Sequence, residues 1–439
     1  MKVKRLKMTS FRGISDLTLE FHETEPTVFI GINGVGKSSI LDCLVVLLSR
    51  LLAQIKFEFE FNPSFVFVNV PGDQSLGEQD IAKECSFSER DITNGSRRTD
   101  NEITISLNSK EVTWSLTTGK IKNIIDKRED VRELKSLTGE IYMKLQGTPK
   151  DDIPLAIYYP TNRAVFDISL EIPEEHSFKQ IDAYERALTG VQISFKSFFQ
   201  WFRILEDLEN EERRDNSNYR NSQLEAVRNA ISSLLDGFSN LRVRRSPLRI
   251  TITKQGQELI VNQLSDGEKG LLALAGDLAR RLAIANPSLP DPLQGSGVVL
   301  IDEIELHLHP KWQREIIPAL TRTFPNCQFI VTTHSPQVIS QVKPEGIYIL
   351  ERTDDGIVAM RPESSYGRDT NRILEDLMDT PERPQEIKES LLELFRLIAK
   401  GELDSARQLH QKIADEIGAD EPELVGATVS IRRREILGR

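Results

Sequence analysis

The chain of 439 residues lacks several features that would define its class of protein. Its three cysteines, Cys43, Cys85 and Cys327, do not show the spacing of a metal site or a disulfide framework, so a reducing compartment is expected. There is no run of 18 uncharged apolar residues and no secretion-signal pattern, and we therefore expect a cytoplasmic protein without a membrane span. The net charge of −11 argues against uniform electrostatic attachment to nucleic acid, although a local basic patch remains compatible with it.

The sequence does contain a phosphate-binding motif near its start. Gly31–Ser38 has the pattern G-x-x-x-x-G-K-S of a P-loop. The short apolar run Thr27–Ile30 before it suits a buried strand, and the Leu- and Val-rich segment Ser39–Ile55 after it suits a buried helix. A strand, a glycine-rich loop and a helix N-terminus together direct backbone N–H groups at an anion. A chance glycine-rich turn is the alternative, and both flanks argue against it.

The P-loop predicts ATP and Mg²⁺ as ligands. Lys37 is placed to reach the β- and γ-phosphates, and the hydroxyl of Ser38 is placed to reach Mg²⁺. The remaining residues expected to contact the nucleotide at this loop are Gly31, Asn33, Gly34, Gly36 and Ser39.

A second motif far along the chain complements the first. Gly297–Ile301 is an apolar strand that ends in two carboxylates, as in a Walker B strand. Asp302 at its tip would hold Mg²⁺, and Glu303 would act as the catalytic residue that polarises the attacking water. A strand that simply ends in solvated acids is the alternative, but the P-loop makes a shared nucleotide site the better interpretation.

Periodicity predicts a mixed α/β chain. Strands are expected at Lys2–Ser10, Leu17–Phe21, Phe57–Phe61, Phe65–Val68, Glu102–Leu107, Glu111–Leu116, Pro154–Tyr159, Leu248–Thr253 and Glu258–Val261. Helical spacing covers 178–238, with a second helix at Gln223–Leu235, and further helices are expected at Gly270–Ala285, Ile387–Ala399 and Leu403–Ile417.

Two further motifs carry a family resemblance. Leu264–Glu268, with the sequence L-S-D-G-E, resembles the signature motif of ABC-type ATPases and lies between the P-loop and the Walker B strand, in the order that this family uses. The resemblance implies that Ser265, Gly267 and Glu268 contact the nucleotide of a partner subunit, whereas an ordinary helix N-cap is the alternative. Phe329–Pro336 resembles the strand that carries the switch histidine, which would be His334, a second catalytic residue.

The segment after the Walker B strand indicates a subgroup of the ABC-type ATPases. Glu305–Pro310, E-L-H-L-H-P, resembles the D-loop of the ATPases related to RecF, SMC and the OLD proteins, and Lys7–Gly13 resembles their first strands. An H-x-H metal pair is the alternative for the D-loop, but no third ligand is evident. Gln79 is the candidate Q-loop glutamine.

The resemblance implies a fold and its division. We expect an α/β ABC-type P-loop NTPase, with a RecA-like lobe and an antiparallel β subdomain, an inserted α-helical hairpin and a C-terminal helical tail. The expected ranges are 1–125 for lobe I with the P-loop, 126–245 for the helical insertion, 246–360 for lobe II and 361–439 for the C-terminal helical region.

Other stretches resemble the ATPases of Septu anti-phage systems, the PtuA family: Pro154–Arg163, Ser365–Asn371, Arg383–Pro384 and Gly401–Arg407. This resemblance implies a regulatory ATPase that controls a separate HNH nuclease (PtuB-like) through ATP-dependent dimerisation. The implied assembly is a homodimer or an oligomer of dimers, with DNA or a retron reverse transcriptase and its msDNA as further candidate partners. The alternatives are a RecF-like DNA repair ATPase and a nucleotide-gated scaffold with little turnover.

The C-terminal part of the sequence shows no pattern of a nuclease. Only 105 residues follow His334, without a recognisable Toprim pattern, and His410 is the one histidine among them, whereas an HNH centre needs two. Apolar residues at helical spacing (Leu391, Leu392, Leu394, Phe395 and Ile398) form a stripe that either packs on the chain's own ATPase lobe or docks a partner.

Overall fold

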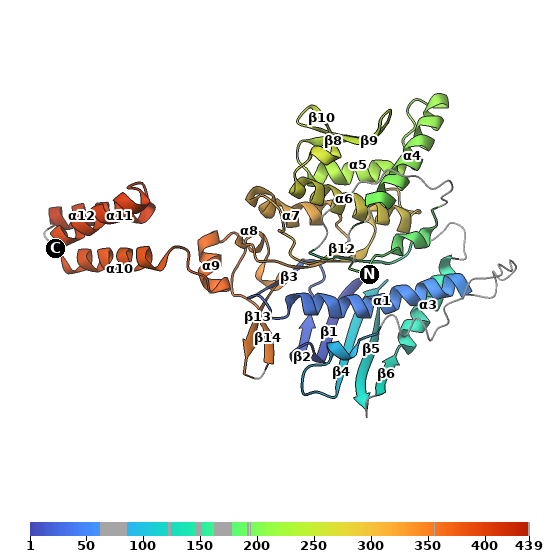
Figure 1. Cartoon of the computed structure of the whole chain (residues 1–439), viewed down its shortest axis with the longest axis horizontal. Coiled ribbons are helices and arrows are strands. Elements are labelled where there is room, and N and C mark those ends of the chain that lie inside the picture. The colour runs from blue at the N-terminus through green and yellow to red at the C-terminus, as the bar shows by residue number, and fades with distance from the viewer. Residues whose placement is uncertain are drawn as a thin grey trace. The chain divides into compact units, whose positions relative to one another are not determined.

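The computed structural model describes residues 1–61, 86–121, 124–145, 152–161, 178–190, 193, 195–354 and 356–437. The chain divides into two compact units, Met1–Arg368 and Asp369–Arg439 (Figure 1). Gln79 and the strand predicted at Phe65–Val68 lie outside the described residues. Within the described ranges, no helix is both long and apolar enough to cross a membrane.

The first unit begins with an antiparallel sheet in the order β2-β1-β4-β5-β6. Its strands are β1 (Lys2–Phe11), β2 (Ile14–Glu20), β4 (Arg98–Leu107), β5 (Lys110–Ile121) and β6 (Ile124–Asp130). The predicted hairpin is confirmed, since Glu102 pairs with Ser115 and the turn residues Asn108 and Ser109 adopt positive φ angles. One face of this sheet is tied to helix α1, because the buried indole Nε1 of Trp114 donates to the carbonyl of Leu47 at 3.1 Å.

The central sheet has the order β14-β13-β3-β12-β11-β7. Its strands are β3 (Thr27–Ile30), β7 (Leu155–Tyr159), β11 (Gly297–Ile301), β12 (Cys327–Thr332), β13 (Ile347–Thr353) and β14 (Gly356–Met360), and all but β14 are parallel. Every residue of β3 and β11 is buried, which explains why Val28–Ile30 and Val298–Ile301 are all apolar. The P-loop and Walker B strands are therefore both in the core of one sheet, with β12 between them.

Helix α1 (Lys37–Phe61) is longer than predicted, and the strand expected at Phe57–Phe61 is wrong. The alternation of Phe and Glu there imitates a strand, but polar side chains one helical turn apart continue the helix. The buried guanidinium of Arg50 donates to Gln54 at 2.9 Å, and Gln54 donates to Glu58 at 3.3 Å. Phe59 then packs edge-on against Tyr142 of helix α3 (Arg132–Leu145), so tertiary contacts outweigh the local pattern.

The range 126–245, expected to be a helical insertion, contains more than helices. Strand β7 lies inside it and pairs in register with β11, so this part belongs to the central sheet. The reason is topological, since a parallel strand needs a long connection from its neighbour. The helical hairpin itself is α4 (Phe195–Asp215) and α5 (Ser222–Leu234), followed by a small sheet of β8 (Phe238–Arg245), β9 (Leu248–Lys254) and β10 (Gln257–Ile260).

Three further helices complete the first unit: α6 (Asp266–Ala285), α7 (Pro310–Thr323) and α8 (Pro336–Ile339). Helix α6 begins four residues before the predicted start, because its N-terminal cap lies within the signature-like motif. Most of α6 is buried, as expected for a helix that is covered on several sides.

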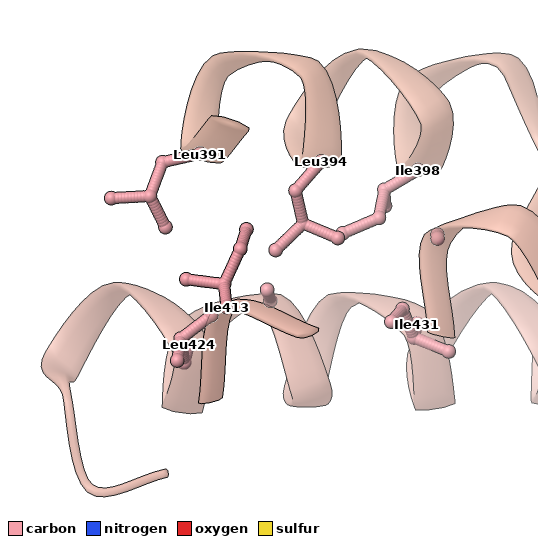
Figure 2. Close-up of a cluster of buried hydrophobic side chains, with 8 residues drawn as sticks. Leu391, Leu394, Ile398, Ile413, Leu424 and Ile431 are labelled. Atoms are coloured by element: carbon pink, nitrogen blue, oxygen red, sulfur yellow. The ribbon is translucent and has the colours of Figure 1, made fainter. Parts of the chain in front are cut away.

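The second unit is helical: α9 (Thr370–Met378), α10 (Gln385–Lys400), α11 (Leu403–Ile417) and α12 (Pro422–Leu437). Helices α10 to α12 share a small apolar core, whose larger side chains face one another in Figure 2. Leu391, Leu394 and Ile398 of the predicted stripe lie in this core, whereas Leu392 and Phe395 are 53% and 39% exposed. Three of the five stripe residues thus pack within their own unit, against α11 and against a further helix, α12, that was not predicted.

Candidate nucleotide-binding site

The P-loop glycines adopt backbone conformations that disfavour other residues. Gly31, Gly34 and Gly36 have φ angles of 142°, 78° and 109°. A side chain at Gly31 would also collide with the chain, since its Cβ would lie 2.5 Å from the carbonyl oxygen of Leu350 on β13. The loop then enters α1 directly, with Ile40 donating to the carbonyl of Gly36 at 3.0 Å.

Lys37 lies folded against its own loop. Its ammonium donates to the carbonyls of Gly31 at 2.8 Å and Ile32 at 3.0 Å, and the residue is only 6% exposed. Burial lowers the pKa of Lys37. The nearby carboxylates of Asp302, Glu303 and Glu305 partly offset this effect, because their negative charges raise the same pKa. The positive charge predicted for phosphate binding is therefore at the loop, held by neutral carbonyls that an anion could replace.

Asp302 brings the two nucleotide motifs together. The Ser38 hydroxyl donates to its Oδ1 at 3.2 Å, and the Thr332 hydroxyl donates to the same oxygen at 2.5 Å. The contact follows from topology, since β11 and β12 are parallel neighbours and both end at this edge of the sheet. A buried carboxylate beside a hydroxyl is a hard oxygen donor set that fits Mg²⁺, so Ser38 and Asp302 are the residues that would hold it.

Glu303 leaves the strand in an unusual conformation. Its φ angle is 47°, in the left-handed region that side-chain-bearing residues seldom adopt. Thr332 stabilises this bend, because its Oγ1 accepts the backbone N–H of Glu303 at 2.7 Å. The bend turns the chain out of the Walker B strand directly at the predicted catalytic carboxylate, as strained backbone at functional sites often does.

Glu305 holds the segment that carries His334. One of its oxygens accepts the Thr333 hydroxyl at 2.7 Å, and the other accepts the backbone N–H of His334 at 2.5 Å. Burial, and then the positive charge of Lys37, lower the pKa of His334 below its ordinary value of 6.5. Sequence reasoning gave Glu305 no role of its own. Its position two residues after the Walker B glutamate, opposite a Thr-Thr-His run, was the available signal.

The signature-like motif is a complete helix cap. The N–H of Ser265 donates to Glu268 Oε2 at 2.9 Å, and the N–H of Glu268 donates back to Ser265 Oγ at 3.4 Å. The other oxygen of Glu268 accepts the ammonium of Lys254 at 2.5 Å. Both carboxylate oxygens of Glu268 are therefore engaged inside the chain, and its predicted contact with nucleotide remains a prediction.

The D-loop packs directly on this cap. A Cβ at Gly267 would lie 2.4 Å from the carbonyl oxygen of His307, so only glycine allows so close an approach. His309 caps α7, since its Nδ1 accepts the N–H of Lys311 at 3.2 Å. Across the described ranges, no group of three histidine, cysteine or acidic side chains is arranged to hold a metal ion.

A buried polar network joins α6 to the Walker B strand. The Tyr159 hydroxyl at the end of β7 donates to Asp277 of α6 at 3.0 Å, and the carbonyl of Tyr159 accepts the N–H of Asp302 at 2.9 Å. Asp277 also accepts from Arg280 at 2.9 Å and from Arg281 at 2.7 Å. Burial alone would raise the pKa of Asp277, but these two guanidiniums lower it to about 2. The network was not predicted, because its members are far apart in sequence.

The structure brings only some of the predicted residues together. Lys37, Ser38, Asp302 and the switch segment lie close to one another, as their hydrogen bonds and electrostatic interactions show. Within the described parts of the chain, no hydrogen bond or ion pair joins Ser265, Gly267 or Glu268 to the P-loop. A P-loop that faces a Walker B aspartate on a mostly parallel sheet defines an ATP-binding P-loop NTPase, and a signature-like cap on a separate helix makes it ABC-type.

Comparison with known proteins agrees with this class. A family model described as "AAA domain" matches residues 5–238, and a second one, described as "AAA domain, putative AbiEii toxin, Type IV TA system", matches residues 161–340. The Retron Ec83 probable ATPase of Escherichia coli is 30% identical over 499 residues, covering 99% of this chain and 87% of that protein. The Retron Vc95 probable ATPase of Vibrio cholerae serotype O1 biovar El Tor is also 30% identical, covering 92% and 85%.

The chain therefore belongs to the AAA-domain family of retron ATPases. It is also related to the Septu protein PtuA of Bacillus thuringiensis, which is 30% identical over 147 residues and covers 32% of this chain and 37% of that one. Among solved structures, an Smc head bound to the C-winged helix domain of ScpA covers 82% of this chain, with 14% identity and a TM-score of 0.45.

Proposed function

We propose that this chain is the ATP-binding and ATP-hydrolysing regulatory subunit of an anti-phage defence complex. In this proposal, ATP-dependent dimerisation of the chain controls a separate HNH-type nuclease. Membership of the retron ATPase family and the relationship to PtuA support the defence role.

The proposal of dimerisation rests on the separation of the signature-like cap from the P-loop. Ser265 is exposed at the start of α6, and the described residues offer it no contact with the P-loop of the same chain. The signature motif of an ABC-type ATPase acts by contacting a bound nucleotide. A second copy, placed head to tail, would bring each cap to the other's P-loop, so that two nucleotides are sandwiched between two chains.

The residues at the P-loop side divide the chemistry between them. The loop N–H groups and Lys37 would bind the β- and γ-phosphates. Ser38 and Asp302 would hold Mg²⁺, which would neutralise phosphate charge. Glu303 orients the attacking water and accepts its proton. His334 contacts the γ-phosphate or that water, and Glu305 fixes the segment on which His334 lies.

The nuclease is proposed as a separate protein. The relationship to PtuA supports a partnership with an HNH protein. The exposed Leu392 and Phe395 on α10 are candidate contacts for that partner.

The test is to co-express this chain with a PtuB-like HNH protein and to measure cleavage of plasmid DNA by the purified complex. Lys37→Ala should trap the nucleotide-free state, and Glu303→Gln should trap the ATP-bound state. We expect the two complexes to cleave at clearly different rates, with the sign showing which state activates. Equal rates in both variants and the wild type, with the nuclease present in equal amounts, would contradict nucleotide control.

A further inference from the structure

A cavity of about 510 Å³ lies away from the nucleotide site, where α4, α5 and β8 meet. Its described lining is rich in one kind of side chain, comprising Arg213, Arg220, Arg228, Arg242, Arg244 and Arg245. Three glutamates also line it, so the cavity carries an excess of positive charge in a chain whose net charge is −11. The arginines come from two helices, the loop between them and a strand, and they therefore surround the space rather than follow one surface.

Half of these arginines already have acidic partners. Arg228 pairs with Glu209 at 2.9 Å and with Glu225 at 2.7 Å, and Arg245 pairs with Glu206. Arg244 pairs with Glu258 of β10. The three glutamates of the cavity lining are thus neutralised by arginines of the same lining. These ion pairs hold the paired guanidiniums in place, and the lining keeps a net positive charge.

The other three arginines have no ion pair within 4 Å among the residues that the structure describes. Arg242 donates only to the amide oxygen of Asn240, at 2.9 Å, and Arg220 donates only to the carbonyl of the preceding Tyr219, at 2.8 Å. Arg213 is exposed at the end of α4 and exerts only an electrostatic influence on Glu209. Three guanidiniums at one cavity, without an anionic partner in the described part of the chain, are the feature that requires an explanation.

The geometry of β8 argues against an acidic peptide as the ligand. Strand β8 is an edge of its sheet, where an extended peptide could add as a new strand. That edge is already occupied at Val243, whose N–H donates to Glu206 at 3.1 Å and whose carbonyl accepts from Arg245. A peptide would find these backbone groups taken, whereas a phosphate chain needs only the guanidiniums.

We propose that the arginine cavity between α4, α5 and β8 binds the phosphodiester backbone of a nucleic-acid strand. Guanidinium groups form two parallel hydrogen bonds to a phosphate, which lysine cannot do, and all six cationic side chains of the lining are arginines. None of the described lining residues is aromatic, so bases have no stacking surface here. Binding is therefore independent of base sequence.

This inference does not rest on the proposed control of a nuclease, and it assigns a location to a nucleic-acid contact that no motif of the nucleotide site provides. Its failure would leave the ATPase role intact. Conversely, the cavity shares no lining residue with the P-loop or the Walker B strand, so loss of ATP hydrolysis would leave this inference standing.

The test is a fluorescence-anisotropy titration of the full chain with a fluorescein-labelled, mixed-sequence 20-nucleotide DNA. The variant R213Q/R220Q/R242Q removes the three arginines without ion pairs. We expect it to bind at least about 10-fold more weakly, because several charge-assisted contacts are lost. The slope of log K against log salt should fall by about 2, at roughly 0.7 per phosphate contact for single strands.

The matched control is R372Q/R396Q/R407Q, which removes the same charge from exposed arginines of the second unit. It should bind DNA like the wild type, and both variants should retain ATP hydrolysis, which reports that the first unit is folded. If the triple variant is unstable, Arg242→Gln alone serves, with a smaller loss expected.

Titrations with duplex DNA and with RNA of the same length show which kind of nucleic acid the cavity binds. Binding of either one that depends on these arginines supports the inference. Equal affinity of the cavity variant and its control would overturn it, as would no binding by the wild type. Displacement of DNA by poly-glutamate as effectively as by unlabelled DNA would instead assign the cavity to acidic proteins, and displacement by millimolar ATP would assign it to free nucleotides.

Discussion

The P-loop side of the nucleotide site and the signature-like start of α6 differ in how their polar groups are satisfied. At the P-loop, Lys37 is held by two neutral carbonyls and Ser38 by Asp302, and ATP with Mg²⁺ would replace these contacts with stronger ones. At α6, Ser265 and Glu268 cap the helix reciprocally, and nothing needs to be replaced. The first region is therefore a site prepared for a ligand. The second is a stable structural element, which under the proposed function would meet a ligand only in a dimer.

The largest expected effect separates chemistry from binding within the P-loop side. Glu303→Gln keeps the size and hydrogen bonding of the side chain but removes the base, so ATP turnover should fall by about 10²–10⁴-fold. ATP affinity, measured by calorimetric titration, should stay close to that of the wild type. Turnover at the wild-type rate would transfer the role of base to His334.

Lys37→Ala should weaken ATP binding about 100-fold, which corresponds to about 2.7 kcal/mol for lost charge-assisted hydrogen bonds to two phosphates. The same titration measures it, with Lys311→Ala on the exposed start of α7 as the control. Unchanged affinity would show that the observed contacts of Lys37 with Gly31 and Ile32 are its permanent partners.

The comparison predicts unequal effects of two serine substitutions on the free energy of unfolding. Ser265→Ala removes a helix N-cap and should lower the free energy of unfolding of the first unit by about 1 kcal/mol. Ser38→Ala should leave that free energy nearly unchanged, because it removes one hydrogen bond of 3.2 Å and no helix cap. Urea unfolding without nucleotide measures both, and equal losses would remove the distinction between the two regions.

The smallest expected effect concerns pH. The pKa of His334 is lowered in the folded chain by burial and by Lys37, so the unfolded chain binds a proton more readily near pH 6.5. Acidification through pH 6.5 towards the lower folded pKa should therefore destabilise the wild type more than His334→Asn, and this loss should level off below the folded pKa. Thermal unfolding between pH 7.5 and 5 checks it, and parallel curves for the two proteins would refute it.

The nucleotide motifs were predictable because their chemistry requires fixed residue types at fixed spacing. The pairing of Ser38 with Asp302 follows from the P-loop and a strand that ends in carboxylates. The roles of Thr332 and Glu305, and the Tyr159–Asp277 network, were not predictable, since they arise from which strand ends lie side by side.

Errors in the fold have the same origin. The residues Phe57–Phe61 alternate like a strand, whereas the contacts of α1 with Glu129 and Tyr142 and the bond from Gln54 to Glu58 favour a helix. Helix α12 was missed because Gly426 and β-branched residues weaken its helical pattern, although Leu424, Ala427 and Ile431 are buried against α10 and α11.

The central claim is that the start of α6 completes the nucleotide site of a second copy, and mixing two inactive variants tests it most directly. Lys37→Ala removes the phosphate-binding ammonium of the P-loop, and Ser265→Arg places a bulky side chain on the exposed cap. Equal amounts of the two, refolded or co-expressed so that mixed dimers form, should recover about a quarter of the wild-type ATPase rate, since half of the dimers are mixed and each holds one complete site. A rate no higher than that of either variant alone, with mixed dimers confirmed by mass spectrometry, would contradict the claim.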